Sequence, residues 1–456
     1  MKNKRAFCII LFFLSVYPSY CQDLQLENYV RTGLESNLAL LQKQDDFAMS
    51  LRALKSAAGY FFPDISLNAR YTVARGGRVI EFPVGDMLNP VYNTLNLLTQ
   101  SEQFPNVENQ EFPFYRPQEQ ETKLSLVQPV FNAQIIYNYQ VEKGKMISEK
   151  IGVDIYKREL VNEIKKAYYN YQKAVQLKKL MDETLVLLTE NVRVSKSLFN
   201  NGMVTSDVIF RSEAELQKIK ASLAEAEKMV SVSKAYLNFL INRPLETEIE
   251  SALNEISSGE LPVLSSDEQI HSALNTREEL LQINNYQSVG DKYIKLARSS
   301  NYPNVYFAVN YGIQGEKYSF TSDDDFMLAS LVLQWNLFQG LKNNANVQQA
   351  KIASHQLELK RQEVERQIEM QIIDASYDLM AASESLAASE KQSEAAEKAY
   401  KVVEHRYSNG QAALIEFIDA RTAMTTSKQS LIIIYFDYKI KQAGYERVTA
   451  TSAIYY

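Results

Sequence analysis

The chain contains two copies of one sequence pattern, and this repeat restricts the possible folds more than any other feature. Residues 32–71 align with residues 272–311 without a gap, at a shift of 240 positions. Eight positions are identical in this alignment, including the prolines Pro63 and Pro303. Further along, the shift falls to 208, where two glycines match: Gly202 and Gly410. We therefore expect two similar structural repeats.

Each repeat has the same predicted order of elements: helix, strand, loop, strand, very long helix, tight turn and helix. In the first repeat (22–248) these are 24–60, 64–74, 122–131, 132–198 and 206–242. In the second repeat (249–456) they are 267–299, 304–313, 326–338, 341–407 and 412–447. The shift changes between Pro63 and Phe131, where the proline-rich segment 76–121 lies. This segment predicts a long loop at the tip of a hairpin.

The predicted strands alternate between apolar and polar residues. Apolar side chains recur at every second position over much of both first strands: Ile65, Leu67, Tyr71 and Val73, and Val305, Phe307, Val309 and Tyr311. A period of two places one set on each face of a strand. Over about ten residues the pattern is typical of membrane β-barrel strands, although a half-buried sheet in a soluble domain is the alternative. A barrel needs about eight strands, so four would require strands from other chains.

The two long segments predict coiled-coil helices. Segments 132–198 and 341–407 are 67 residues each, which is ~100 Å of helix at ~1.5 Å per residue. Apolar residues follow one another at spacings of three and four: Val161, Ile164, Tyr168, Tyr171 and Val175, and Ile372, Ala375, Leu379, Ala382 and Leu386. This spacing indicates helices packed side by side over many turns. A compact soluble enzyme would not accommodate such lengths.

The N-terminus predicts export. Basic residues precede an apolar run at 6–16, which is typical of a signal peptide, and we place it at 1–21. The alternative is a lipoprotein site at Cys21. Both cysteines, Cys8 and Cys21, lie in this leader, so the mature chain would hold no disulfide. Removing Lys2, Lys4 and Arg5 changes the net charge from −6 to −9 (−6 minus 3), which does not suggest a nucleic-acid partner.

The sequence carries no recognisable catalytic motif. The three histidines, His271, His355 and His405, fit no spacing of metal ligands. The acidic run 323–325 is expected in a solvated loop between two strands. We therefore expect no enzymatic activity, no cofactor and no metal site.

The two predicted turns resemble those of the TolC-like outer-membrane factor family. They are SLFNNGMVTSDV at 197–208 and RYSNGQAALIEFIDA at 406–420, and the resemblance extends over the mature sequence. It implies a mainly helical fold with membrane strands. Such a protein is a homotrimer with a 12-stranded β-barrel, four strands per protomer, above a long periplasmic helical tunnel. It lies in the outer membrane, in contact with lipid, and has a large periplasmic portion.

The resemblance also implies the residues of a periplasmic gate: Glu416, Asp419, Tyr407 and Asp207. Asp207 lies one residue closer to Gly202 than the family pattern expects, and Ala412 replaces a tethering arginine. We therefore expect a weaker or differently built latch. The alternative is that Glu416 and Asp419 are carboxylates of a first helical turn, which the helix dipole favours. The turns would dock an adaptor through six residues: Gly202, Met203, Val204, Gly410, Gln411 and Ala412.

By this resemblance the chain is an exit duct of a tripartite efflux or type I secretion system. It would conduct substrates passively from an inner-membrane pump or ABC transporter, and a periplasmic adaptor would open its tip like an iris. The alternative is that the chain is itself a periplasmic coiled-coil adaptor. Adaptors have one helical hairpin, whereas two are predicted here.

Overall fold

The computed structural model describes residues 21–250, 273–318, 321, 323–409, 411–452 and 454. The predictions for the signal peptide at 1–20 and for Gly410 lie outside these residues, as does the side chain of Cys21. The chain divides into two compact units. The helical unit comprises 1–51, 144–288 and 355–456, and the strand unit comprises 52–143 and 289–354. Each repeat contributes segments to both units.

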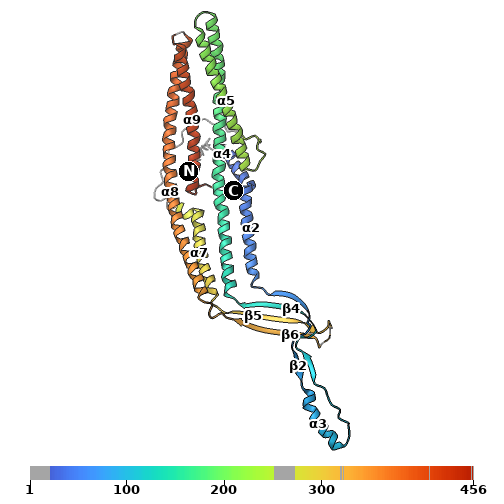
Figure 1. The fold of residues 1–456 in the computed structure, drawn as a ribbon. Coiled ribbons are helices and arrows are strands. Elements are labelled where there is room, and N and C mark those ends of the chain that lie inside the picture. The colour runs from blue at the N-terminus through green and yellow to red at the C-terminus, as the bar shows by residue number, and fades with distance from the viewer. Residues whose placement is uncertain are drawn as a thin grey trace, which may run out of the picture. The chain divides into compact units, whose positions relative to one another are not determined.

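The helical unit is built on the four longest helices (Figure 1). These are α4 (Ala133–Asn200), α5 (Ser206–Leu240), α8 (Lys342–Ser408) and α9 (Leu414–Val448). Helices α4 and α8 have 68 and 67 residues, so the predicted lengths are confirmed. Residues 273–276 and α7 (Glu278–Ser299) are helical, and the predicted start of this segment at 267 lies outside the described residues. No helix among the described residues is both long and apolar enough to cross a membrane.

The predicted first helix, 24–60, is wrong in one respect, because it is two helices. α1 (Cys21–Ser36) and α2 (Leu38–Gly59) are separated at Asn37. The Asn37 side chain accepts a hydrogen bond from the Leu40 N–H at 2.9 Å and donates one to the Leu240 carbonyl at 2.8 Å. Asn37 therefore acts as the N-terminal cap of α2 while it fixes the end of α5. The break between α1 and α2 therefore depends on a contact with a distant segment of the chain.

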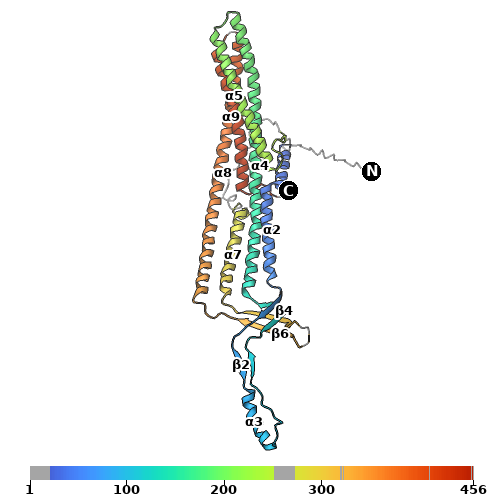
Figure 2. The ribbon, with the colours of Figure 1, turned by 45° about the vertical axis from the view of Figure 1, so that its right-hand side comes forward.

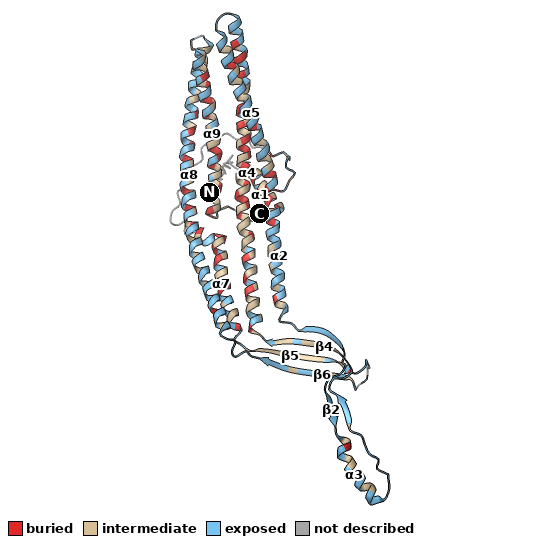
Figure 3. Cartoon of the chain, viewed as in Figure 1, coloured by how far each residue is buried: buried red, intermediate tan, exposed pale blue. Residues whose placement is uncertain are grey.

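The core of the helical unit follows the predicted spacings (Figure 3). One cluster lies mainly on α1, α4 and α5, where Val161, Ile164 and Tyr168 are buried. A second cluster joins the two repeats by packing α4 and Ala226 of α5 against α8 and α9. A third lies between α7, α8 and the end of α9, around Ile372. The turned view in Figure 2 shows the same long helices side by side.

The strand unit contains a four-stranded antiparallel sheet with the order β1-β4-β5-β6. The strands are β1 (Asp64–Val73), β4 (Gln118–Phe131), β5 (Asn304–Gly315) and β6 (Asp325–Gln334), as the sequence predicts to within a few residues. Pro63 and Pro303 directly precede the first strand of each repeat. Strands β1 and β6 are the two edges of the sheet.

The predicted long loop at 76–121 is wrong, because this segment has structure of its own. It contains β2 (Val79–Phe82), α3 (Val84–Thr99) and β3 (Gln110–Pro113), and β2 pairs with β3. The amide of Asn89 exchanges two hydrogen bonds with the backbone of Val107, and Asn96 does the same with Phe104. These two amides, two helical turns apart, hold α3 against the chain that returns from it.

Candidate gate at the helix turns

The turn between α4 and α5 ends the long helix with a left-handed glycine. Gly202 has φ +68°, a conformation that glycine adopts without the penalty of a Cβ atom. The Met203 N–H donates to the Leu198 carbonyl and the Gly202 N–H to the Phe199 carbonyl, both at 2.9 Å. These two bonds form a Schellman motif, which satisfies the last carbonyls of α4. Met203 is left exposed on the turn.

The turn between α8 and α9 shares one of these hydrogen bonds. The Gln411 N–H donates to the Arg406 carbonyl at 2.8 Å, the counterpart of the bond from Met203. The Arg406 guanidinium in turn donates to the Gln411 carbonyl at 3.1 Å. The two repeats thus form the same hydrogen bond at equivalent positions of their turns. Val204 and Ala412 are partly buried and Gln411 is exposed, so only part of the predicted docking set is freely accessible.

The two predicted gate carboxylates, Glu416 and Asp419, have different surroundings. Glu416 lies in the first turn of α9, accepts a long hydrogen bond from the Ala413 N–H at 3.5 Å and pairs with Arg406 at 3.6 Å. Asp419 is exposed, lines an open groove beside Gln392, and forms no ion pair with the described residues. Glu416 therefore helps to hold the start of α9, and Arg406 partly balances its charge. The charge of Asp419 is not balanced by a paired cation among the described residues.

The other two predicted gate residues, Tyr407 and Asp207, are not brought together in one chain. The Tyr407 ring stacks on Phe417 with centroids 4.8 Å apart, and burial raises the pKa of its phenol. Asp207 accepts a hydrogen bond from Thr205 and lies 3.6 Å from Arg211. Across the described residues, no hydrogen bond or ion pair joins Tyr407 to Asp207. Among all the residues that the structure describes, no group of three or more acidic, histidine or cysteine side chains could hold a metal ion.

A buried ion pair two turns from the tip was missed by the sequence analysis. Arg421 of α9 is only 3% exposed and donates to Glu215 of α5 at 3.3 Å. Burial lowers the pKa of Arg421, while Glu215 and Tyr400 act in the opposite direction. The pair joins the helical hairpin of the first repeat to that of the second. Its signal was an arginine at core spacing between two buried residues, Ile418 and Met424.

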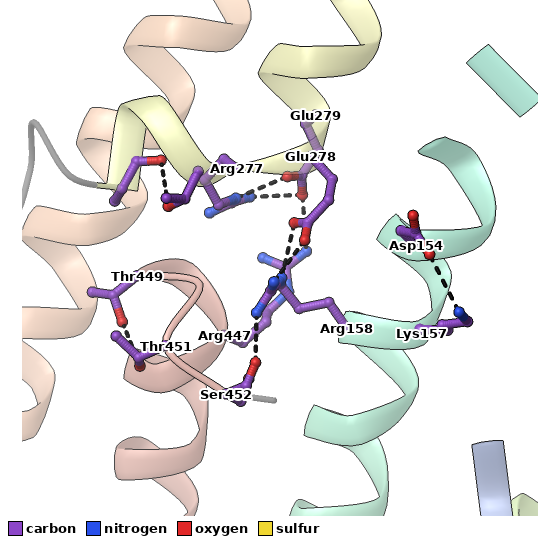
Figure 4. Close-up of polar contacts among 12 residues, drawn as sticks. Asp154, Lys157, Arg158, Arg277, Glu278, Glu279, Arg447, Thr449, Thr451 and Ser452 are labelled. Atoms are coloured by element: carbon purple, nitrogen blue, oxygen red, sulfur yellow. Dashed lines mark hydrogen bonds and ion pairs between the residues drawn. The ribbon is translucent and has the colours of Figure 1, made fainter. Parts of the chain in front are cut away.

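A second buried ionic cluster joins the repeats near the end of α9 (Figure 4). Arg277 makes two hydrogen bonds to Glu279, at 2.7 and 2.8 Å, and donates to the Val448 carbonyl. Arg158 of α4 makes two hydrogen bonds to Glu278, at 2.6 and 2.8 Å. Burial alone would raise the pKa of Glu279, but hydrogen bonds and charge from Arg277 outweigh it and lower that pKa.

The strand register places apolar residues of all four strands on one face. In one row across the sheet, Leu67, Leu124, Tyr311 and Met327 are paired. Ile65, Val309 and Leu331 share this face, and Leu67, Met327 and Leu331 are each about 70% exposed. The other face carries polar pairs such as Arg70 and Glu121, 3.5 Å apart, although Leu328 and Val332 interrupt it. The predicted alternation is therefore present in three dimensions.

Comparison with known protein families gives one match. Residues 269–444 match the family model of the outer membrane efflux protein. The matched residues lie in the second half of the chain and include the turn at 406–420. This match confirms the family predicted from the two turns and supports the predicted outer-membrane location. No curated protein matches the chain.

Solved outer-membrane channels show that the TolC-like fold extends over nearly the whole chain. The CmeC channel of Campylobacter jejuni matches with a TM-score of 0.78 at 13% identity, covering 98% of this chain and 93% of that chain. The outer-membrane channel OprN matches with a TM-score of 0.76 at 14% identity, covering 94% and 91%. MtrE of Neisseria gonorrhoeae, solved in its open state, matches with a TM-score of 0.75 at 16% identity, covering 93% and 88%. The fold class predicted from the sequence is confirmed.

Proposed function

We propose that the chain is one protomer of a trimeric exit duct in the outer membrane. The observation that carries this proposal is the sheet, which has an exposed apolar face and two free edges, β1 and β6. Unpaired strand edges are not tolerated in lipid, because no water is present to bond them. Pairing β1 of one copy with β6 of the next satisfies both edges. Three copies supply twelve strands and place the apolar face against lipid.

The helical unit is the periplasmic part of this duct, and its two turns form the end that opens. Substrates pass from an inner-membrane pump or ABC transporter through the duct, in an efflux or type I secretion system. A periplasmic adaptor contacts the turns around Gly202 and Gln411 and moves the helical hairpins apart. The outer membrane efflux domain at 269–444 supports this role.

Within this gate, the exposed charge of Asp419 should set ion selectivity more than that of Glu416. Three copies of Asp419 around a narrow axis would attract cations, whereas Arg406 partly balances each Glu416. We expect Asp419→Asn to reduce the cation preference of the channel in planar bilayers by at least twofold more than Glu416→Gln. Reversal potentials in a salt gradient measure this. Equal effects, or no effect of Asp419→Asn, would remove Asp419 from the gate.

Tyr407 should hold the closed state through its hydroxyl. A tyrosine phenol is already neutral at physiological pH and can donate, and burial raises the pKa of Tyr407 further. We propose that this hydroxyl donates to Asp207 of a neighbouring copy. Tyr407→Phe keeps the ring that stacks on Phe417 and removes only the donor. We expect this variant, like Asp207→Ala, to raise the leak conductance of the resting channel. Unchanged leak in both variants contradicts the tether.

The second candidate function is a periplasmic adaptor, which the long helical hairpins alone would permit. An adaptor would not require exposed apolar residues on four paired strands. Cell fractionation separates the two functions, because a duct protomer sediments with the outer membrane and needs detergent for extraction. A chain released by osmotic shock without detergent would support the adaptor.

A further inference from the structure

An open pocket of about 520 Å³ lies at the end of the sheet where β5 begins and β6 ends. Its walls are the end of α7, the link between β6 and α8, and the first turns of α8. Asn301 holds these segments together. Its carbonyl accepts a hydrogen bond from the Trp335 indole N–H at 3.0 Å, and its side-chain oxygen accepts one from the Asn343 amide at 3.1 Å. The shape of the pocket is therefore fixed by contacts within the strand unit.

Two cations line this pocket, and no acidic residue does. Arg298 lies in the last turn of α7 and Lys351 in the third turn of α8, and both are exposed. Neither forms an ion pair with any residue that the structure describes. The first turn of α8 lines the same pocket, and the N-terminal end of a helix carries partial positive charge. Unpaired Arg and Lys side chains beside a helix N-terminus favour a phosphate group.

Three apolar side chains of the same pocket are largely exposed. Leu337, Phe338 and Leu341 are 79%, 78% and 72% exposed. Leu341 has φ +64°, a left-handed conformation that a leucine adopts only at a cost, and it follows Gly340 at φ +58°. The link thus directs its apolar side chains outward, next to the two cations. This combination matches an amphiphile that has an anionic head and an apolar tail.

The aromatic residues at this end of the sheet indicate the level of the membrane surface. Tyr60 precedes β1, Tyr302 precedes β5 and Trp335 follows β6, and all three are at least half exposed. Tyrosine and tryptophan gather at the boundary between lipid and water. In the proposed duct this end of the sheet joins the periplasmic helices, so it lies at the inner leaflet of the outer membrane. The pocket is then at the height of the phospholipid headgroups.

We propose that this pocket binds an anionic phospholipid of the inner leaflet, with Arg298 and Lys351 at its phosphate and the apolar residues of the link along its acyl chains. Basic pockets at the membrane surface bind lipid headgroups in this way. The inference rests on the proposed position of the sheet in the membrane. A soluble phosphate ester would use only the cations, whereas a phospholipid also covers the exposed apolar side chains. The lipid is therefore the occupant.

Fluorescence of Trp335 tests the site, because this residue is the only tryptophan of the chain and its indole bonds to Asn301 in the pocket. The mature protein is reconstituted into vesicles of phosphatidylcholine and phosphatidylglycerol, with bromine on the acyl chains of one lipid at a time. Bromine quenches tryptophan at close contact. We expect phosphatidylglycerol to quench with an apparent affinity about fivefold higher than that of phosphatidylcholine. Replacing both cations, as Arg298→Gln with Lys351→Gln, should remove this preference.

The matched control is Lys295→Gln with Lys342→Gln. It removes the same charge from the same two helices, but neither residue lines the pocket. The control should retain most of the preference for phosphatidylglycerol. Equal losses in the two double variants would show a diffuse basic surface and would overturn the site.

Two further outcomes would replace the lipid by another occupant and so overturn the proposal. Loss of the preference in excess soluble glycerol phosphate would identify a site for soluble phosphates. Dissociation of the oligomer when both pocket cations are replaced, seen by native mass spectrometry, would identify a neighbouring copy in the pocket.

The quenching of the unaltered protein separates this inference from the proposed function. Equal quenching of Trp335 by the two lipids would overturn the site while the duct remains. If neither brominated lipid quenches Trp335, this end of the sheet does not contact the membrane, and the proposed function itself is contradicted.

Discussion

Replacing Arg277 with methionine should lower the apparent free energy of unfolding of the helical unit by about 3 kcal/mol, because it removes the main partner of a largely buried carboxylate. Arg277 is 2% exposed, and its loss would leave the Glu279 carboxylate with the longer contact to Arg447, at 3.8 Å, and would remove a donor from the Val448 carbonyl. Methionine keeps much of the side-chain volume, so the effect reports the lost hydrogen bonds. Urea unfolding in detergent, followed by circular dichroism, measures it.

The matched control is Arg193→Met. Arg193 makes a similar pair with Glu190 at 2.6 Å, but both side chains are more than half exposed. Exposed pairs contribute about 0–1 kcal/mol. Equal losses in the two variants would mean that the buried cluster adds nothing beyond a surface pair.

The same cluster should make stability depend on pH. The pKa of Glu279 is lowered in the folded state, so the unfolded state binds its proton first as the pH falls. The stabilisation is therefore complete above the ordinary pKa of glutamate, 4.5, and is lost as the pH falls through the lower pKa of the folded state. Glu279→Gln should remove this contribution to the acid dependence. It should have little further effect on that dependence once Arg277 has been replaced by methionine.

Replacing Arg421 with methionine should have the largest effect on gating. The Arg421–Glu215 pair joins the two helical hairpins. The tethering arginine that the family resemblance leads us to expect is absent, because Ala412 occupies its position. Separating the hairpins at this point requires this ion pair to break. If the pair contributes about 1.4 kcal/mol to the closed state, its loss raises the ratio of open to closed channels about tenfold. Single-channel recording of the resting duct gives this ratio.

Lys196→Met is the control for the gating experiment. Lys196 pairs with Glu213 at 2.8 Å at about the same distance from the tip, but within the first hairpin only. This variant should leave the resting channel closed. Equal opening by both variants would show that the effect does not depend on joining the two hairpins.

Several features of the fold were predictable because they depend on local sequence. Pro63 and Pro303 mark the start of the first strand in each repeat, and alternation at Ile65 and Leu67 predicts their common face. Gly202 predicts a left-handed turn because other residues adopt that conformation at a cost. The long helices were predictable because core spacings of three and four persist over many turns.

Other features depend on contacts between distant segments, which a single sequence does not reveal. Asn37 breaks the first helix because its amide reaches the end of α5, about 200 residues away. Asn89 and Asn96 order a segment whose prolines suggested a loop. Arg421 has core spacing in the sequence, but only the fold shows its partner, Glu215 of α5. Arg277 likewise donates to the Val448 carbonyl, 171 residues away. The gate residues themselves rest on the family resemblance.

The central claim is that the sheet is incomplete in one chain and is closed by other copies in lipid. Native mass spectrometry of the mature protein, extracted from the outer membrane in detergent, tests this most directly. The account predicts a mass three times that of one chain. A monomer that remains soluble without detergent would contradict it.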